Sequence, residues 1–241
     1  MPRNKEQQPH EGHAALGVPS AVKRPAQHAC GKGAPMRFLI TAGPTREYLD
    51  PVRYLSNASS GRMGCALAAA ATGAGHRVAL VLGPTTAGAP PVDELVRVTS
   101  AADMFEAVVA RFDGCDVFVS AAAVCDYRPV FREERKIKKS GGRVTLELER
   151  TADILLAMSK RRRRQTLVGF CLETDDLERR ARHKLEVKRL DLVVANGPEA
   201  IDADRQDALL ITARAGCERL TGVTKKELAE HILAAVTRRS R

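Results

Sequence analysis

The feature that most restricts the fold of this chain is the regular alternation of short apolar runs with helical segments. Each run is long enough for one buried strand. The runs lie at Arg37–Ala42, Arg77–Leu82, Leu95–Val98, Asp116–Ala122, Thr166–Leu172, Asp191–Ala195 and Ala208–Thr212. This order predicts an α/β fold: a doubly wound, mostly parallel, Rossmann-like sheet with helices on both faces. Ligands of such sheets bind at the carboxyl ends of the strands.

Five helices are expected between and after these strands. Their first residues or caps are Gly61, Ser100, Thr151, Asp175 and Thr224. The segment 126–149 fits neither pattern, because the basic run Lys136–Ser140 precedes an alternating stretch, Val144–Leu148, that is typical of a half-exposed strand. We expect a flap or β-hairpin extension outside the main sheet, whose lysines close over a phosphorylated ligand.

The first 35 residues differ in composition from the rest of the chain. They are polar, with scattered proline, glycine and histidine, and they have no apolar period. We therefore predict two parts, a disordered N-terminal extension at 1–35 and a single domain at 36–241.

The cysteines and the longest apolar runs indicate the compartment. The six cysteines form no C-x-x-C pair, and several stand in strand-like runs, which favours buried thiols over a zinc site. Such thiols fit a reducing cytoplasm. No apolar run is long enough to cross a membrane, so we expect a cytoplasmic protein without membrane contact.

The formal net charge of +10 favours a polyanionic ligand. The basic residues are not interleaved with aromatic ones, and the chain carries no recognisable RNA- or DNA-binding motif. We therefore expect small phosphorylated molecules as ligands, and no nucleic acid.

A phosphate-binding arrangement is predicted in the stretch 38–70. The first strand ends in the turn Gly43–Thr45, a polar loop follows, and Ser59, Ser60 and Gly61 then open an alanine-rich helix. Free N–H groups at a helix start and the helix dipole both favour an anion there. The stretch matches neither G-x-x-x-x-G-K-[ST] nor G-x-G-x-x-G. Further candidates at strand ends are 120–126, Phe170 and Asn196.

Several motifs, taken in order, resemble one family. They are ITAGPTREYLDPVRYLSNASSGRMG, SAAAVCDYRP, KIKKS, a Thr-Ala-Asp-Ile helix start, VGFCLET and KLEVKRLDLVVAN. From about Arg37 onward the chain resembles phosphopantothenate–cysteine ligase of the bacterial type, also called phosphopantothenoylcysteine synthetase, an enzyme of coenzyme A synthesis. In many bacteria a flavin-dependent decarboxylase domain precedes this domain, whereas only residues 1–35 do so here. We expect a stand-alone ligase and a separate decarboxylase that acts next in the pathway.

The resemblance implies a two-step reaction on a homodimer. The carboxylate of 4′-phosphopantothenate attacks the α-phosphate of CTP, assisted by Mg²⁺, which gives an acyl-cytidylate and pyrophosphate. The amine of cysteine then displaces CMP and forms the amide. This chemistry needs positioned reactants and neutralised charge more than a protein nucleophile. The resemblance leaves the metal ligands unknown.

The resemblance also implies individual site residues. The catalytic candidates are Asn57, which handles the acyl-cytidylate carbonyl, Arg53, near the same intermediate, and Lys136, on the flap and in contact with the nucleotide. The remaining nucleotide contacts are Ser120, Ala121, Ala122, Asp126, Ala152, Asp153, Ile154, Leu155, Phe170, Lys184 and Lys188, together with Gly43, Thr45, Ser59, Ser60 and Gly61. From the pattern alone, core packing would explain Phe170, and a solvated helix face would explain the two lysines.

Three positions depart from the pattern of the family. Arg62 stands where lysine is common, Cys125 where alanine is common, and Ala152 where proline is frequent. Arg62 keeps the positive charge and Cys125 keeps a small side chain, so no catalytic residue type is lost.

Two other functions are weighed against the ligase. An NAD(P)-binding reductase would suit the sheet, but the dinucleotide fingerprint is missing after residues 38–42. An RNA-binding protein would suit the charge, and it would bind RNA with a steep salt dependence and without a preference for CTP.

Overall fold

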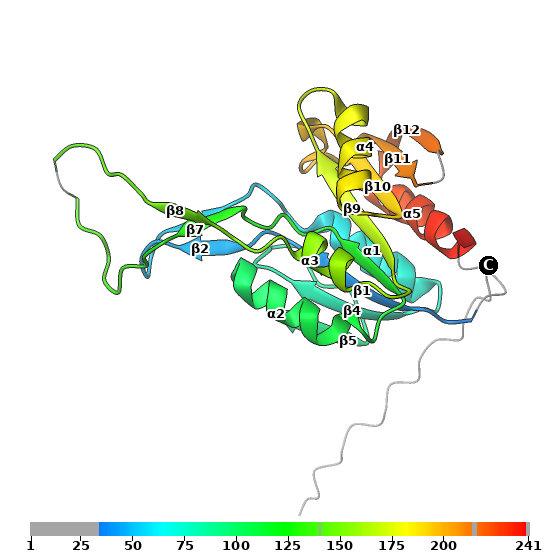
Figure 1. Ribbon diagram of the computed structural model, residues 1–241, viewed down its shortest axis with the longest axis horizontal. Helices are drawn as coiled ribbons and strands as arrows, with labels where there is room; N and C mark the ends of the chain where they lie inside the picture. The colour runs from blue at the N-terminus through cyan, green and yellow to red at the C-terminus, as the bar shows by residue number, and fades with distance from the viewer. Residues whose placement is uncertain (1–33, 140, 214–215, 240–241) are drawn as a thin grey trace, which may run out of the picture. The chain divides into compact units, whose positions relative to one another are not determined.

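The computed structural model describes residues 34–139, 141–213 and 216–239, so the predicted disorder of 1–35 falls almost wholly outside the described residues. Eight strands form one sheet, in the order β12-β11-β10-β9-β6-β1-β4-β5 (Figure 1). Their bounds are β1 Arg37–Ala42, β4 Arg77–Leu82, β5 Glu94–Arg97, β6 Val117–Ser120, β9 Thr166–Leu172, β10 Leu192–Asn196, β11 Arg205–Thr212 and β12 Cys217–Thr224. The pairs from β5 to β10 are parallel, and β10–β11 and β11–β12 are antiparallel. The predicted doubly wound, mostly parallel sheet is confirmed.

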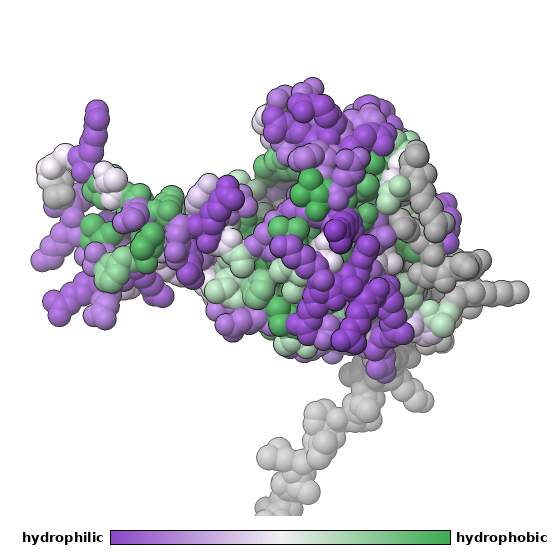
Figure 2. Space-filling model, in the orientation of Figure 1, coloured by the Kyte–Doolittle hydropathy of each residue, from purple (hydrophilic) through white to green (hydrophobic). Residues whose placement is uncertain are grey.

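Two short antiparallel ribbons stand outside this sheet. One pairs β2 (Arg46–Tyr48) with β3 (Tyr54–Ser56), and the other pairs β7 (Tyr127–Pro129) with β8 (Leu148–Arg150). The second ribbon and the loop between its strands form the extension on the left of Figure 1. Figure 2 shows apolar side chains gathered among charged ones on this extension.

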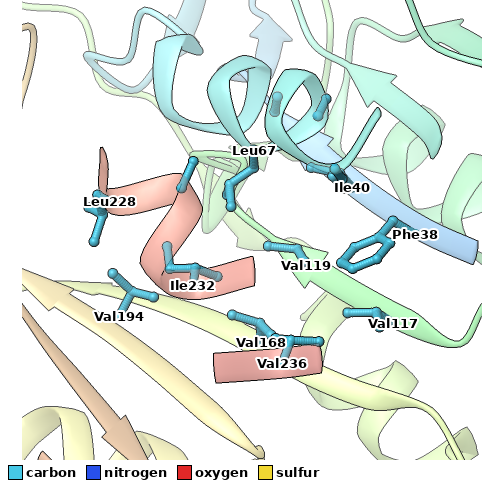
Figure 3. Close-up of a cluster of buried hydrophobic side chains, with 14 of the residues drawn as sticks. Phe38, Ile40, Leu67, Val117, Val119, Val168, Val194, Leu228, Ile232 and Val236 are labelled. Carbon is cyan, nitrogen blue, oxygen red and sulfur yellow. The ribbon is translucent and has the colours of Figure 1, made fainter. Parts of the chain in front are cut away.

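Five helices cover the sheet: α1 (Arg62–Gly73), α2 (Ala101–Phe112), α3 (Ile154–Arg161), α4 (Leu177–Val187) and α5 (Lys225–Arg239). Successive side chains of a strand point to opposite faces. Phe38 and Ile40 of β1 therefore lie in one core cluster with α1 and α5, whereas Leu39 lies in a second cluster with α2, α3 and α4. Figure 3 shows the first cluster, where Leu228 and Ile232 of α5 face the sheet.

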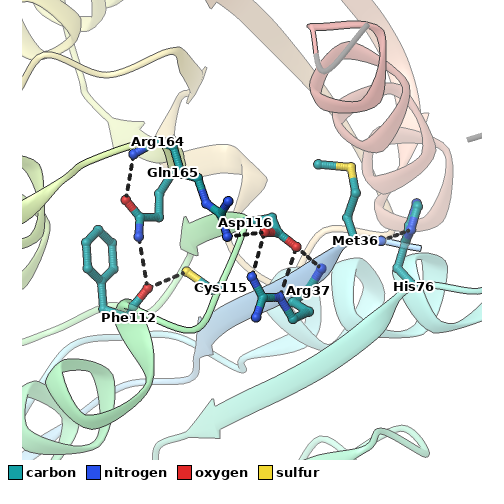
Figure 4. Close-up of polar contacts among 8 residues, drawn as sticks. All are labelled: Met36, Arg37, His76, Phe112, Cys115, Asp116, Arg164 and Gln165. Atoms are coloured by element: carbon teal, nitrogen blue, oxygen red, sulfur yellow. Dashed lines mark hydrogen bonds and ion pairs between the residues drawn. The ribbon is translucent and has the colours of Figure 1, made fainter. Parts of the chain in front are cut away.

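The amino ends of β1 and β6 are joined by an ion pair. Arg37 begins β1, and its guanidinium donates to both carboxylate oxygens of Asp116 at 2.9 and 3.1 Å (Figure 4). Hydrogen bonding to Arg37 lowers the pKa of Asp116. This contact lies at the edge of the sheet opposite the strand carboxyl ends, so it steadies the sheet without entering a ligand site.

The helix starts were predicted correctly in part. Ser100 caps α2 through a full capping box with Asp103, and Glu227 accepts hydrogen bonds from Thr224 at the start of α5. Thr151 was wrongly predicted to cap α3, because the side chain of Asp153 accepts from the Leu156 N–H and takes that place.

Two strand predictions were also wrong. The predicted strand Val144–Leu148 is an exposed loop up to residue 147, and only its last residue begins β8. Ala208–Thr212 was expected as the last strand, but the chain turns back and adds β12 antiparallel at the edge of the sheet.

α1 lies unusually close to β1. A Cβ atom on Gly64 would lie 2.4 Å from the Cβ of Ala42, which is closer than real side chains approach. α1 can therefore seat its first turn against the carboxyl end of β1 only because residue 64 is glycine. In the part of the chain that the structure describes, no helix is both long and apolar enough to cross a membrane.

Candidate functional site

A cleft of about 930 Å³ opens at the carboxyl ends of the parallel strands. Strand order reverses between β1 and β6, since β4 and β5 follow β1 on one side and β6 and β9 lie on the other. Such a switch point separates the loops that follow its two strands and leaves a crevice for a ligand. The lining residues come from the loop before α1, from the loops after β6 and β10, from β7, β8, β9 and β11, from the starts of α1, α3 and α5, and from α4.

The start of α1 is an anion-binding wall of this cleft. Gly61 has a left-handed φ of 72°, no side chain caps the helix, and its first turn holds no acidic residue. Cys65 N–H makes the first intrahelical bond, to Gly61. The N–H groups of residues 62–64 precede that bond and have no partner within the helix. All three residues line the cleft, as do Ser59 and Ser60.

Asn57 is held at the junction of two loops. Its amide nitrogen donates to the carbonyl oxygens of Ala123 at 3.3 Å and Val124 at 3.0 Å. These bonds leave its amide oxygen without a partner among the described residues. Asn57 is exposed and lines the cleft, so its side chain is oriented before any ligand arrives.

Gly43 and Thr45, two of the predicted nucleotide contacts, are not among the residues that line the cleft. Thr45 is fully buried, and its hydroxyl accepts from the Cys125 N–H at 3.0 Å. Gly43, with a φ of 78°, lies against Gly61, where an added Cβ on Gly61 would be 3.1 Å from the Gly43 Cα. Their roles are to tie the loop after β1 to the loop after β6.

Two lysines at the C-terminal end of α4 line the cleft. Lys188 Nζ lies 2.7 Å from a carboxylate oxygen of Asp153, and Lys184 donates to the carbonyl oxygen of Phe170. Burial, together with the positive charge of Lys188, lowers the pKa of Lys184. Burial works to raise the pKa of Asp153, but its hydrogen bonds to Lys188 and the Leu156 N–H outweigh this and lower it. The solvated-face explanation is therefore wrong for both lysines.

Most of the other predicted residues also line the cleft. They are Ser120, Ala121, Ala122 and Asp126 after β6, Ala152, Asp153, Ile154 and Leu155 at the start of α3, and Phe170 in β9. Phe170 is only partly buried, and one side of it packs against the core cluster of α1 and α5. The core-packing explanation for Phe170 is confirmed, and its place on the cleft wall leaves the nucleotide contact a prediction.

Arg53 and Lys136 do not line the cleft, but the segments that carry them are bound to each other. Asp50 accepts from the Ile137 N–H at 3.1 Å, and the Arg53 guanidinium donates to the Ile137 carbonyl at 3.0 Å and to Asp50 at 2.7 Å. Burial works to raise the pKa of Asp50, but three backbone N–H groups and Arg53 lower it to about 2. Asp50 is thus an ionised anchor that fixes the residue next to Lys136.

Several lining residues were not among the predicted contacts. Arg62, Gln206 and Lys225 line the cleft, as do Tyr127 and Arg150 of the extension. Arg62 was noted in sequence only as a departure from lysine, and Lys225 lies 105 residues beyond Ser120 with no motif around it. Gln206 and Lys225 reach the cleft because β11 pairs antiparallel with β12, which leads directly into α5, whereas Arg62 reaches it as the first residue of α1.

The donor set of the cleft is poor in metal ligands. Among the described residues, no group of three or more His, Cys, Asp or Glu side chains is arranged to hold a metal ion. Of the carboxylates that line the cleft, Asp153 is paired with Lys188. Mg²⁺ commonly takes only one or two carboxylates and completes its shell with phosphate oxygens and water. These residues therefore fit a Mg²⁺ ion that arrives with a phosphorylated ligand.

Comparison with known proteins finds close relatives. A family model described as the DNA/pantothenate metabolism flavoprotein C-terminal domain matches residues 34–239. The coenzyme A biosynthesis bifunctional protein CoaBC of Bacillus subtilis (strain 168) is 44% identical over 207 residues, which are 80% of this chain and 51% of that relative. CoaBC of Escherichia coli (strain K12) is 44% identical over 165 residues, which are 67% of this chain and 41% of that relative. The chain thus spans about half the length of these curated relatives, or less.

Solved structures of related proteins have the same fold. The crystal structure of the C-terminal domain of CoaBC matches with a TM-score of 0.74 and 37% identity, over 86% of this chain and 97% of that one. A Cab2 H337A variant in complex with phosphopantothenate-cysteine matches with a TM-score of 0.68 at 17% identity, over 84% of this chain and 86% of that one, and it supports the fold alone. Because the curated relatives are named bifunctional, the stand-alone arrangement stays a prediction.

The anchor at Asp50 can be tested by substitution. In Asp50→Asn, one of the two carboxylate oxygens that accept from Val52, Arg53 and Ile137 becomes an NH₂ group, which cannot accept, and the negative charge is lost. We expect trypsin to cleave after Lys136, Lys138 or Lys139 several times faster than in the wild type, as followed by mass spectrometry at pH 8. Asp113→Asn is the control, because Asp113 pairs with Arg161 instead. Equal cleavage of Asp50→Asn and the wild type would contradict the anchor.

Proposed function

This chain belongs to the family of the DNA/pantothenate metabolism flavoprotein C-terminal domain, and we propose that it joins 4′-phosphopantothenate to cysteine at the expense of CTP. The observation that carries the proposal is the cleft itself. The uncapped start of α1, the partly buried Lys184 and the pre-oriented Asn57 all face it. An enzyme that forms and uses an acyl phosphate needs groups that bind its phosphate and a polar side chain that contacts its acyl carbonyl.

The first step is activation of the carboxylate. The pantothenate carboxylate attacks the α-phosphorus of CTP, a carboxylate oxygen–phosphorus bond forms, and the bond to the β-phosphate oxygen breaks with its electron pair on pyrophosphate. The protein positions the two anions and offsets their repulsion through the free N–H groups of α1 and through Lys184 and Lys188. Mg²⁺ bound with CTP would supply further charge neutralisation.

The second step forms the amide. The cysteine amine attacks the acyl carbon of the cytidylate, CMP leaves with the carboxylate oxygen that carried its phosphorus, and the amine loses one proton. Asn57 is proposed to handle the acyl carbonyl during this step by donating from its amide nitrogen, which would exchange its longer, 3.3 Å bond to the Ala123 carbonyl for the substrate oxygen. Two protein carbonyls fix its amide nitrogen. The side chain therefore loses little orientational freedom when the intermediate binds.

A homodimer and the flap are part of the proposal. The extension exposes a set of large apolar side chains: Tyr127, Val130, Phe131, Val144, Leu146 and Leu148. A second copy of the chain is proposed to cover them, and Lys136 and Arg53, which lie outside the cleft of their own chain, are proposed to serve a cleft at that interface. A separate decarboxylase is proposed to act on the product in the cytoplasm.

The dimer can be tested by light scattering. The wild type should have twice the mass of the chain at micromolar concentration. Phe131→Asp should shift it toward one chain, because Phe131 is 70% exposed and a buried unpaired carboxylate is costly. Leu172→Asp is the control, since Leu172 is also exposed but lies in β9. A wild-type protein with the mass of one chain would contradict the dimer.

The nucleotide requirement tests the function. Purified protein with 4′-phosphopantothenate and Mg²⁺ should release pyrophosphate with CTP and much less with ATP. It should release CMP only after cysteine is added. Binding of NAD(P)H, followed by fluorescence, and salt-dependent RNA binding would indicate the two competing functions. If CTP yields neither pyrophosphate nor the amide, the ligase proposal fails.

The role of Asn57 has a separate prediction. Asn57→Ala should slow amide formation by about a hundredfold or more, the scale seen when one pre-oriented polar group is removed. Acyl-cytidylate should then accumulate, which quenched-flow chromatography measures, while pyrophosphate release persists in the first turnover. Ala58→Gly, one residue along the same loop, is the control. Normal turnover in Asn57→Ala would refute the role.

A further inference from the structure

Glu47 is a buried carboxylate that the proposed reaction does not use. It is the middle residue of β2 and is 5% exposed, whereas its neighbours Arg46 and Tyr48 are only partly buried. Acidic side chains are almost never buried to this degree unless they are paired. Glu47 forms no ion pair among the residues that the structure describes, and it does not line the cleft.

The start of α2 takes the place of a cation beside Glu47. The carboxylate accepts from the N–H group of Ala101, the first residue of α2, at 2.8 Å. The capping box of Ser100 and Asp103 serves other N–H groups, so the Ala101 N–H depends on Glu47 for a partner. The helix dipole also favours a negative charge at this position. Glu47 is therefore held by a helix that begins 54 residues later in the sequence.

Glu47 lies opposite the strand that leads to Asn57. In the ribbon of β2 and β3, Glu47 pairs with Leu55, and β3 ends one residue before Asn57. The N–H group of Arg46 donates to the carbonyl oxygen of Thr99 at 2.8 Å. Two adjacent residues of β2 thus bind the ribbon to the start of α2, one through its backbone and one through its side chain.

Cys125 connects this ribbon with the loop that orients Asn57. Its thiol donates to the carbonyl oxygen of Leu55 at 3.8 Å. Burial raises the pKa of this thiol, and the negative charge of Glu47 adds to the rise, so the carboxylate lies near Cys125. The carbonyl oxygen of Val124, one residue earlier, accepts from the amide of Asn57. A shift of the ribbon would therefore move Asn57 relative to the loop whose carbonyls hold its side chain.

We propose that Glu47 is a positioning residue for amide formation, because its bond to the start of α2 fixes the ribbon of β2 and β3 and thereby the side chain of Asn57. This proposal rests on the proposed function and extends it to a residue outside the cleft. The first step of the reaction is proposed to depend on α1 and on the lysines of α4. Loss of Glu47 should therefore slow the second step far more than the first.

Quenched-flow kinetics tests this assignment. Glu47→Ala should slow amide formation about tenfold or more, because a small displacement of a positioned group costs at least that much. Pyrophosphate release in the first turnover and the KM for CTP should change less than about twofold. Glu47→Gln keeps an oxygen that can accept from Ala101, and it should restore most of the rate. Equal slowing of both steps in Glu47→Ala, or no recovery in Glu47→Gln, would overturn the proposal.

Asp103→Ala is the matched control. Asp103 caps the same helix start, but its carboxylate accepts from the N–H groups of Thr99 and Ser100, and it makes no hydrogen bond to the ribbon within the described part of the chain. This variant should lower the melting temperature, as Glu47→Ala does, and leave both steps unchanged within about twofold. Selective slowing of amide formation in Asp103→Ala would assign the effect to the stability of α2 and overturn the role of Glu47.

Nuclear magnetic resonance separates this proposal from the proposed function, because it needs no substrate. The asparagines of the chain are Asn4, Asn57 and Asn196, so protein labelled with ¹⁵N-asparagine gives few side-chain amide signals, and Asn57→Ala identifies the relevant one. That signal should shift or broaden in Glu47→Ala and keep its wild-type position in Asp103→Ala. If Glu47→Ala fails to fold, Glu47→Asp, whose carboxylate is one methylene shorter, should show the same change.

The two readouts fail independently. A shifted Asn57 signal in a protein that ligates nothing would keep the positioning role and remove the ligase function. An unshifted signal in an active enzyme would keep the function and remove the role of Glu47.

Discussion

The close packing of α1 on β1 is the constraint on which the rest of the site depends. Gly64 lies so near Ala42 that no side chain fits between them, and a Cβ on Gly61 would lie 3.1 Å from the Gly43 Cα. The helix therefore starts at the carboxyl edge of the sheet, where its unpaired N–H groups open into the crevice between β1 and β6. A helix held farther out would place the same groups in solvent.

Near the start of α1, polar contacts hold the loop after β1 and the loop after β6 together and fix the wall of the cleft. Thr45 joins the loops after β1 and β6 from below, and Asn57 joins them at the surface. The basic groups form two sets on the cleft wall: Lys184 and Lys188 of α4 beside Asp153, and Arg62 of α1 with Lys225 of α5. An elongated ligand with separated anionic groups matches this division better than a compact one.

The sequence predicted correctly those features that depend on residues close together in the chain. The six parallel strands are continuous apolar runs, and the Ser100 capping box acts within four residues, so both were found. β12 was missed because an edge strand needs apolar side chains on one face only, and Cys217–Thr224 is mostly exposed. Thr151 and Asp153 are both residue types that often cap helices. The Thr151 hydroxyl instead donates to the Cys125 carbonyl, so Asp153 caps α3. Motifs located Asn57 and Lys184, but a lone lysine such as Lys225 carries no signal until the fold brings it to the cleft.

The pairing of α1 with α5 has a consequence for synthesis of the protein. The apolar side of α1 that carries Leu67 and Ala68 packs in the same cluster as Leu228 and Ile232, more than 150 residues later in the sequence. A ribosome delivers the first helix long before the last. The emerging chain must therefore leave the part of that surface that α5 covers exposed until α5 has been synthesised.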